Sequence, residues 1–144
     1  MSANVQINER PHKLNDPAQK VIYPELSYQI IGILFTVHNE LGRFCNEKQY
    51  GDSIEKHLKT SAVKYDREQI LPPSFAGEAI GRNRVDFLID DKIVLEIKTE
   101  QILTKEDYYQ VQRYLTALKK KLGILVNFRQ KFIAPKRILN AFNA

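Results

Sequence analysis

The segment from Arg84 to Lys98 constrains the fold most, because it reads as two short strands joined by a polar turn over residues 90–92. Side chains in a strand alternate between two faces. The apolar face of this hairpin is expected to carry Val85, Phe87, Ile89, Leu95 and Ile97. A three-residue turn would place Asp86 opposite Glu96 on the other face, beside Lys98. Two carboxylates and an ammonium therefore cluster on one face of a sheet.

The length and composition indicate one globular domain. A chain of 144 residues can form one hydrophobic core but is too short for two ordinary domains. Residues 1–20 are polar and aperiodic, so we expect a flexible N-terminal tail followed by a single domain over residues 21–144. No apolar run approaches the roughly 20 residues of a membrane span, and no secretory signal is recognisable. The lone Cys45 fits a reducing cytoplasmic location, and the formal net charge of +5 permits nucleic-acid binding without requiring it.

Two amphipathic helices are predicted ahead of the hairpin. The first begins at Pro24 and ends at a capping glycine, Gly42, with apolar residues at helical spacing between them. The second runs from about Glu47 to Lys59. Glu47 lies on the apolar side of this helix, one turn before Tyr50. Two interpretations stay open: Glu47 caps the helix N-terminus, or it points into a polar site.

The remaining segments complete a mixed sheet. Alternation predicts a strand over residues 62–71, and residues 75–80 are a candidate for a second short strand. A capping box of Thr104 and Asp107 begins a helix that reaches about Lys121, with Leu122 in its core stripe. Gly123 breaks this helix before a buried strand over residues 124–128, and an edge strand with a helical turn is expected within residues 129–144. This order predicts an α/β (α+β) fold in which helices flank a central mixed sheet.

A divalent cation would explain the acidic face of the hairpin. Burying an unpaired carboxylate is costly, and two close carboxylates also repel each other. Mg²⁺ is typically held by one or two carboxylates with waters and phosphates, so Asp86, Glu96 and the backbone carbonyl of Ile97 are candidate ligands. Lys98 could then hold the attacking water or stabilise charge on a phosphate, as in metal-assisted phosphodiester hydrolysis. The alternative is a solvent-facing hairpin whose acids and lysine make ordinary surface pairs.

Two motifs carry a family resemblance. Asp86 followed by Glu96-x-Lys98 resembles the motif of the PD-(D/E)xK nuclease superfamily, and Gln110-x-x-x-Tyr114 resembles the Q-x-x-x-Y element of its RecB-like branch. Further blocks are similar to the GxxExxY family of that superfamily: Leu41-Gly42, Glu47-x-x-Tyr50, residues 123–128 and Lys136-Arg137-Ile138. The resemblance spans roughly residues 22–139. Phe44 stands where this family has its name-giving glycine, and Val85 precedes Asp86 where the superfamily has proline.

The resemblance implies a restriction-endonuclease-like core with a metal-dependent site. It implies that Asp86 and Glu96 bind Mg²⁺, or Mn²⁺, with Glu47 as an additional acid near the metal. Lys98 would be the catalytic lysine. The Gln110–Tyr114 pair would line the site and orient the substrate or Lys98.

The expected function is therefore that of a Mg²⁺-dependent nuclease whose partner is nucleic acid, namely DNA. The alternatives are a non-catalytic nucleic-acid-binding module and a protein-interaction module on the same fold. A homodimer or a protein partner is expected where a domain this small cuts both strands of a duplex.

Overall fold

A five-stranded mixed sheet forms the centre of the fold, with the strands in chain order across it. The computed structural model describes residues 21–81 and 83–141, so the tail expected over residues 1–20 lies outside the described residues. The strands are β1 (Tyr65–Ile70), β2 (Arg84–Ile89), β3 (Ile93–Lys98), β4 (Leu122–Asn127) and β5 (Lys136–Leu139). β3 and β4 are parallel, whereas the other neighbouring pairs are antiparallel.

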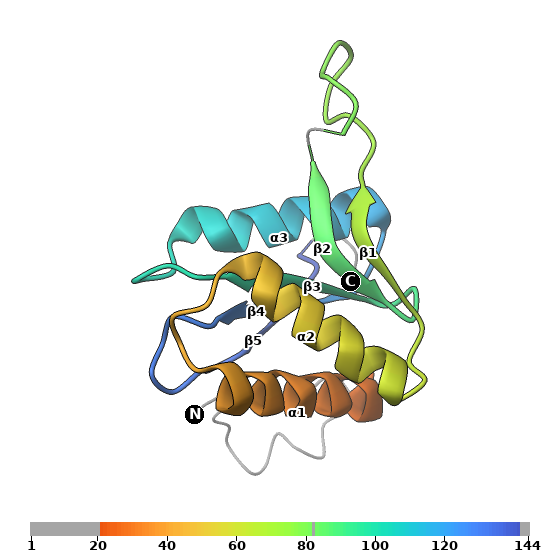
Figure 1. Ribbon diagram of the computed structural model, residues 1–144. Helices are drawn as coiled ribbons and strands as arrows, with labels where there is room; N and C mark the ends of the chain where they lie inside the picture. Colours follow the sequence, from red (N-terminus) through yellow and green to blue (C-terminus); the bar gives the residue numbers. More distant parts are fainter. Residues whose placement is uncertain (1–20, 82, 142–144) are drawn as a thin grey trace, which may run out of the picture.

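Helices cover both faces of the sheet, as Figure 1 shows. α1 (Pro24–Leu41) and α2 (Glu47–Thr60) lie on one face, and α3 (Lys105–Leu118) lies on the other. α3 also supplies the crossover that two parallel neighbours, β3 and β4, require. The predicted α+β core, a mixed sheet flanked by helices, is confirmed. Within the described residues, none of the helices is long and apolar enough to cross a membrane.

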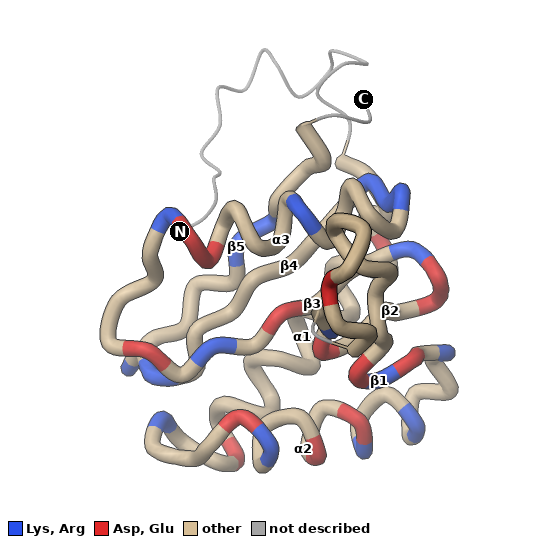
Figure 2. Tube along the Cα trace, turned by 90° about the horizontal axis from the view of Figure 1, so that it is seen from above, with Lys and Arg blue, Asp and Glu red and all other residues tan. Residues whose placement is uncertain are grey.

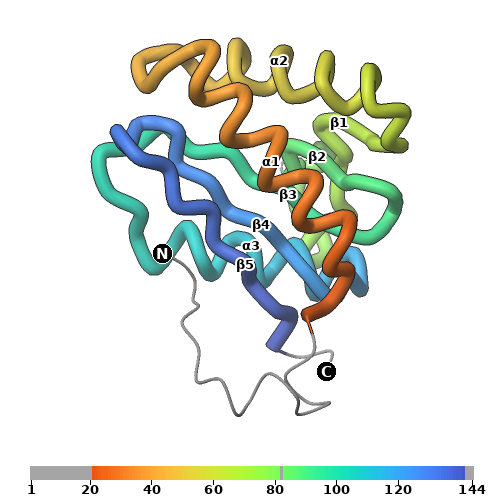
Figure 3. Tube along the Cα trace, turned by 90° about the horizontal axis from the view of Figure 1, so that it is seen from below, coloured from red at the N-terminus to blue at the C-terminus, as the bar shows by residue number. Residues whose placement is uncertain are grey.

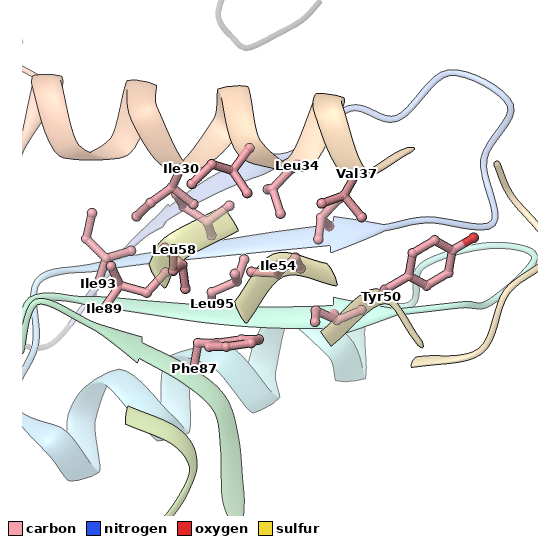
Figure 4. Close-up of a cluster of buried hydrophobic side chains, with 14 of the residues drawn as sticks. Ile30, Leu34, Val37, Tyr50, Ile54, Leu58, Phe87, Ile89, Ile93 and Leu95 are labelled. Atoms are coloured by element: carbon pink, nitrogen blue, oxygen red, sulfur yellow. The ribbon is translucent and has the colours of Figure 1, made fainter. Parts of the chain in front are cut away.

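The larger hydrophobic core lies between the sheet and the α1–α2 pair, and Figure 4 shows most of it. The labelled residues of this core are Ile30, Leu34, Val37, Tyr50, Ile54, Leu58, Phe87, Ile89, Ile93 and Leu95. The Tyr50 ring stacks on Phe128 with 4.2 Å between centroids and 9° between planes. Aromatic pairs of this kind add about 0.5–1.5 kcal/mol beyond the area they bury. The stack therefore fixes the start of α2 against the end of β4.

A second core lies under α3, and it corrects one prediction about the hairpin. Val85 is buried in this core with Leu88 and Val94, whereas Phe87 belongs to the first core. The prediction that Val85 and Phe87 lie on the same face of the sheet is therefore wrong. The reason is local, because the β2–β3 backbone ladder ends at the Phe87–Leu95 pair and the strand changes its facing at Asp86.

The connection between β1 and β2 is not a strand. Residues 75–80, a candidate strand, contain turns and a bend and no strand. Gly77 lies within them at a φ of 99°, and Gly81 follows them at a φ of 86°. Such positive φ values suit glycine but interrupt a strand. This connection projects from the sheet as an arm in Figure 1.

The helix after the hairpin ends one turn earlier than expected. α3 ends at Leu118, and Lys119 takes a left-handed φ of 57° as the C-terminal cap. Leu122 and Gly123 instead begin β4, so Gly123 is a strand residue and not the helix breaker. A Cβ atom at Gly123 would lie 2.7 Å from Val111 Cγ1, which shows that glycine lets α3 pack closely on β4.

Other boundaries agree with the sequence. Gly42 caps α1 at a φ of 76°, and Thr104 with Asp107 forms the predicted capping box of α3. β5 is the expected edge strand. The helical turn predicted after it is absent from Asn140 and Ala141, and residues 142–144 lie outside the described residues.

Candidate active site

Asp86 and Glu96 meet where the ladder between β2 and β3 stops. The Ile97 N–H donates to Asp86 Oδ2 at 2.7 Å, and the Asp86 N–H donates to Glu96 Oε1 at 3.0 Å. Each carboxylate thus takes the place that a backbone carbonyl of the partner strand would have in a regular ladder. These two bonds hold the acids next to each other at the divergence of the strands. The structure therefore brings together the pair that the hairpin pattern predicted.

Burial dominates the electrostatics of this pair. Glu96 is 4% exposed, and its burial, followed by the charge of Asp86, raises its pKa well above the usual range. Burial also raises the pKa of Asp86, although the hydrogen bond from Ile97 and the charge of Lys98 oppose it. Two such acids favour holding a proton between them. A cation that replaced this proton would relieve the same repulsion.

Lys98 reaches the acids from the end of β3 and is held by α3. Its Nζ donates to Gln110 Oε1 at 2.8 Å and lies 3.6 Å from Asp107 Oδ1. The Lys98 side chain is largely buried, at 15% exposure. Gln110 thus positions the ammonium from the opposite wall of the site, which is one of the two roles expected for it.

Tyr114 lies one helical turn after Gln110 and is 5% exposed. Burial, followed by the negative charge of Glu96, raises the pKa of Tyr114 to about 12. The phenol is therefore neutral at physiological pH and can only donate or accept a hydrogen bond there. Its place beside Glu96 and Gln110 agrees with the expectation that it lines the site.

Glu47 lies at the rim, at the first position of α2. The N-cap of α2 is Asn46, which forms a capping box with Gln49, so Glu47 is not the cap. Partial burial and the charge of Asp86 raise the pKa of Glu47, while Lys98 acts to lower it. Glu47 and Asp86 line one cavity of about 320 Å³. The interpretation that Glu47 points into a polar site thus has geometric support.

Sequence reasoning missed a second pair of acids beside Lys98. The Glu100 carboxyl has a pKa raised by burial and then by its hydrogen bond to Asp107. Burial also acts to raise the pKa of Asp107, but hydrogen bonds from Thr104 and Glu100 outweigh it and hold it low. Asp107 was expected to act in helix capping alone. The signal for Glu100 was the alternation Glu96-x-Lys98-x-Glu100, which places all three on one side of an extended chain.

Asn127 lies in a block of the family resemblance, but the sequence analysis gave it no role of its own. It is buried at the end of β4, where its Oδ1 accepts the Glu100 N–H at 3.0 Å and its Nδ2 donates to the Glu100 carbonyl at 2.7 Å. The segment after Lys98 is thereby fixed to the neighbouring parallel strand. A single amide within an otherwise apolar run was the available signal.

The donor set of the site fits Mg²⁺ as an incomplete cage of oxygens. Across residues 21–81 and 83–141, no three His, Cys, Asp or Glu side chains come close enough to hold one ion. Asp86 and Glu96 supply two carboxylates, and the Ile97 peptide adjoins Asp86. Mg²⁺ is commonly bound by one or two carboxylates and completes its shell with waters and phosphate oxygens. The residues present therefore suit such an ion when a phosphate substrate shares the site.

A larger cavity of about 830 Å³ adjoins the site at Tyr114. It lies between α3 and the beginning of the β1–β2 connection, with Tyr109 and Pro72 in its walls. No acid lines it among the described residues. Of these two cavities, only the smaller one has carboxylates in its lining, from the described residues Glu47, Glu68 and Asp86, together with the basic side chains of Lys48, Arg67 and Arg84. Figure 2 shows the acidic position of β3, in red, between α2 and α3.

Comparison with known proteins agrees with this geometry. The family model described as the PD-(D/E)XK nuclease superfamily matches residues 24–138, and the chain belongs to this superfamily. No curated protein matches the chain significantly. Among solved structures, it is similar to the one titled "Crystal structure of SSO0001", with 22% identity and a TM-score of 0.49. That alignment covers 81% of this chain and 57% of the other, so this chain spans little more than half of its length.

The raised pKa of Glu96 predicts a stability change that depends on pH. A carboxyl whose pKa is higher in the folded state favours folding below its unfolded value, near 4.5, and this contribution is lost as pH rises through the folded value. In EDTA, Glu96→Gln should therefore unfold about 3–8 °C above the wild type at pH 8, and the gain should shrink towards pH 4.5. Thermal melts across this pH range measure it.

The matched control for this melt is Asp66→Asn, because Asp66 is an exposed acid on β1. Its melting temperature should follow that of the wild type at every pH. An equal gain for Glu96→Gln at pH 8 and pH 4.5 would contradict the electrostatic explanation, as would no gain at pH 8.

Proposed function

We propose that this protein is a Mg²⁺- or Mn²⁺-dependent nuclease that hydrolyses phosphodiester bonds of DNA. The observation that carries the proposal is the pair of the partly buried Asp86 and the buried Glu96, with Lys98 fixed beside it by Gln110. Within its superfamily we assign the chain to the RecB-like branch and to the GxxExxY family. The Gln110 contact with Lys98 supports the branch, and the anchoring of Tyr50 at the start of α2 supports the family. The lone Cys45 supports a cytoplasmic location.

The proposal gives each residue of the site a role. Asp86 and Glu96, with the Ile97 carbonyl, would hold the ion, and Glu47 would act from the rim as an additional acid near the metal. The ion would supply a Lewis acid and lower the pKa of bound water. Lys98 places positive charge where the phosphate gains negative charge in the transition state. Gln110 keeps this ammonium in place, and the neutral Tyr114 phenol closes the wall beside Glu96.

A cleavage assay tests the proposal. Purified protein should cut labelled linear and plasmid DNA with Mg²⁺ or Mn²⁺ and should stop in EDTA, whereas Asp86→Asn should be inactive with either ion. Comparison with an RNA of the same sequence shows whether the protein cuts DNA or RNA. Cutting by Asp86→Asn at the wild-type rate would point to a contaminant and overturn the proposal, and so would the absence of cutting under every condition.

The alternative is a module that binds nucleic acid or protein without cutting. The acid pair argues against it, because buried carboxylates beside a phosphate backbone repel the ligand and gain nothing for binding alone. Binding to DNA in EDTA without cleavage in either metal would favour this alternative. A second copy of the chain, or a protein partner, is part of the proposal where both strands are cut, and light scattering of the protein–DNA complex tests it.

A further inference from the structure

Two loops meet beside the carboxyl ends of the parallel strands β3 and β4. They are the α1–α2 loop, residues 42–46, and the β4–β5 loop, residues 128–135, and Figures 1 and 3 both show them at the same end of the molecule. We call the basic and aromatic residues of these loops the loop patch: the exposed Phe44, Lys131 and Phe132, and the partly buried Arg43 and Arg129. Phe44 is 78% exposed and Phe132 is 81% exposed. Most of the surface of both rings is therefore open to a ligand.

The loop patch is a built surface, because hydrogen bonds hold the two loops to each other and to the helices α1 and α2. Arg43 Nε donates to the Arg129 carbonyl at 2.8 Å, and His38 Nε2 lies 2.9 Å from the Gln130 carbonyl. The Tyr50 hydroxyl donates to the Gly42 carbonyl at 2.6 Å and anchors the first loop from below. The two loops therefore present their side chains as one unit.

Positive charge and aromatic rings alternate across the loop patch. The Arg43 guanidinium lies 5.0 Å from the Phe44 ring centroid, Arg129 lies 5.9 Å from it, and Lys131 lies 5.5 Å from that of Phe132. None of these three cations forms an ion pair with a described residue, and Arg129 Nε is buried without a hydrogen-bond partner among the described atoms. The charge of the loop patch is thus available to an anionic ligand.

The loop patch is continuous with the acidic site. The Phe128 N–H donates to the Lys98 carbonyl at 2.9 Å, so the second loop leaves the sheet beside the proposed catalytic lysine. The Asn127 side chain accepts hydrogen bonds from the N–H groups of both Glu100 and Arg129. One buried amide therefore fixes both the segment after Lys98 and the base of the loop patch. A strand held at the site has the loop patch as its neighbouring surface.

We propose that the loop patch binds an unpaired stretch of the nucleic-acid strand next to the bond that is cut. Bases stack on Phe44 and Phe132, and phosphates contact Arg43 and Lys131. Base–aromatic stacking needs unstacked bases, which a single strand offers and an intact duplex does not. The substrate class that follows is single-stranded nucleic acid or a duplex with a single-stranded tail. This inference rests on the proposed function, because it places the bound strand next to the bond that is cut. Binding of the strand can still be measured without cleavage.

Fluorescence anisotropy in EDTA tests the inference with the full chain. A labelled 20-nucleotide single strand should bind Phe44→Ala and Phe132→Ala at least about tenfold more weakly than the wild type, because one stacked base is lost in each. Affinity for a blunt duplex should change by less than about twofold. Tyr28→Ala is the matched control, since Tyr28 is an exposed aromatic on α1, at 82% exposure. Lys131→Ala should lower the slope of log Kd against log salt by about 0.7 for the single strand.

The outcomes separate this inference from the nuclease proposal. Equal losses for single strand and duplex, or no loss in either phenylalanine variant, would overturn the stacking role. A change of oligomeric state in Phe44→Ala at unchanged strand affinity would overturn it in favour of a contact between proteins. If the wild type never cleaves but strand binding requires both phenylalanines, the loop patch stands and the nuclease proposal fails. Circular dichroism checks that the variants are folded.

Discussion

Replacing Lys98 with methionine should lower the rate of metal-dependent DNA cleavage by about a hundredfold to a thousandfold. Methionine keeps most of the side-chain volume but removes the ammonium that Gln110 holds beside the acid pair. The charge of Lys98 acts to lower the pKa of five carboxyl groups: Glu47, Asp86, Glu96, Glu100 and Asp107. Without it these acids hold protons more tightly. Single-turnover cleavage rates with Mn²⁺ measure the loss.

Lys92→Met is the control for this rate, because Lys92 is an exposed lysine in the turn of the same hairpin. It should cleave at the wild-type rate. Binding of the uncut single strand in EDTA should change little in Lys98→Met, because the loop patch supplies that affinity. Cleavage by Lys98→Met within about threefold of the wild type would show that the lysine has no catalytic role.

The acid pair and the lysine could be predicted from the sequence because their geometry is local. A short hairpin with a fixed side-chain period leaves little freedom in how Asp86 and Glu96 face each other. Their separation in the chain is spanned by one turn, and the strands on either side are strongly apolar. Gln110 was predicted from the resemblance to the Q-x-x-x-Y element, and in the structure it accepts a hydrogen bond from Lys98 Nζ.

The parts that were missed depend on contacts between distant segments. Glu100 and Asp107 become a pair only through the path of the β3–α3 loop, which the buried Asn127 amide determines from β4. The face on which Val85 lies was also not predicted. The backbone pairing of β2 with β3 ends at Phe87, and at Asp86 a carboxylate accepts the backbone hydrogen bond instead. No pattern within β2 shows that substitution. The sequence period therefore predicts that a hairpin forms. The hydrogen bonds to its two acids determine which face of the sheet Val85 lies on.

The loop patch also depends on contacts between distant segments, so it could not be predicted from the sequence. Its first loop precedes α2 and its second follows β4, so residues more than 80 positions apart form one surface, as the separation of 86 between Arg43 and Arg129 shows. Neither loop carries a periodic signal. The sequence analysis treated Phe44 as a substituted glycine, whereas in the structure the Arg43 and Arg129 guanidinium groups lie 5.0 Å and 5.9 Å from its ring centroid.

The largest stability effect is expected at Tyr50, where Tyr50→Ala should lower the free energy of unfolding by about 3–5 kcal/mol. The ring is fully buried, stacks on Phe128, and fills the space between α2 and β4. Its hydroxyl donates to the Gly42 carbonyl and accepts the Cys45 N–H at 3.2 Å. The alanine variant therefore loses packing, a stack and two hydrogen bonds together. Urea denaturation measures the change.

Tyr50→Phe separates the two contributions, because it keeps the ring and removes the hydroxyl. Its loss of stability should be about 1–3 kcal/mol, the cost of leaving buried backbone groups without a partner. The α1–α2 loop also loses its anchor, so single-strand affinity should fall in Tyr50→Phe although Tyr50 does not touch the strand. Tyr109→Phe, at an exposed tyrosine of α3, is the matched control and should change stability by less than about 0.5 kcal/mol. Unchanged stability and affinity in Tyr50→Phe would show that the loop is held by Arg43 and the Arg129 carbonyl alone.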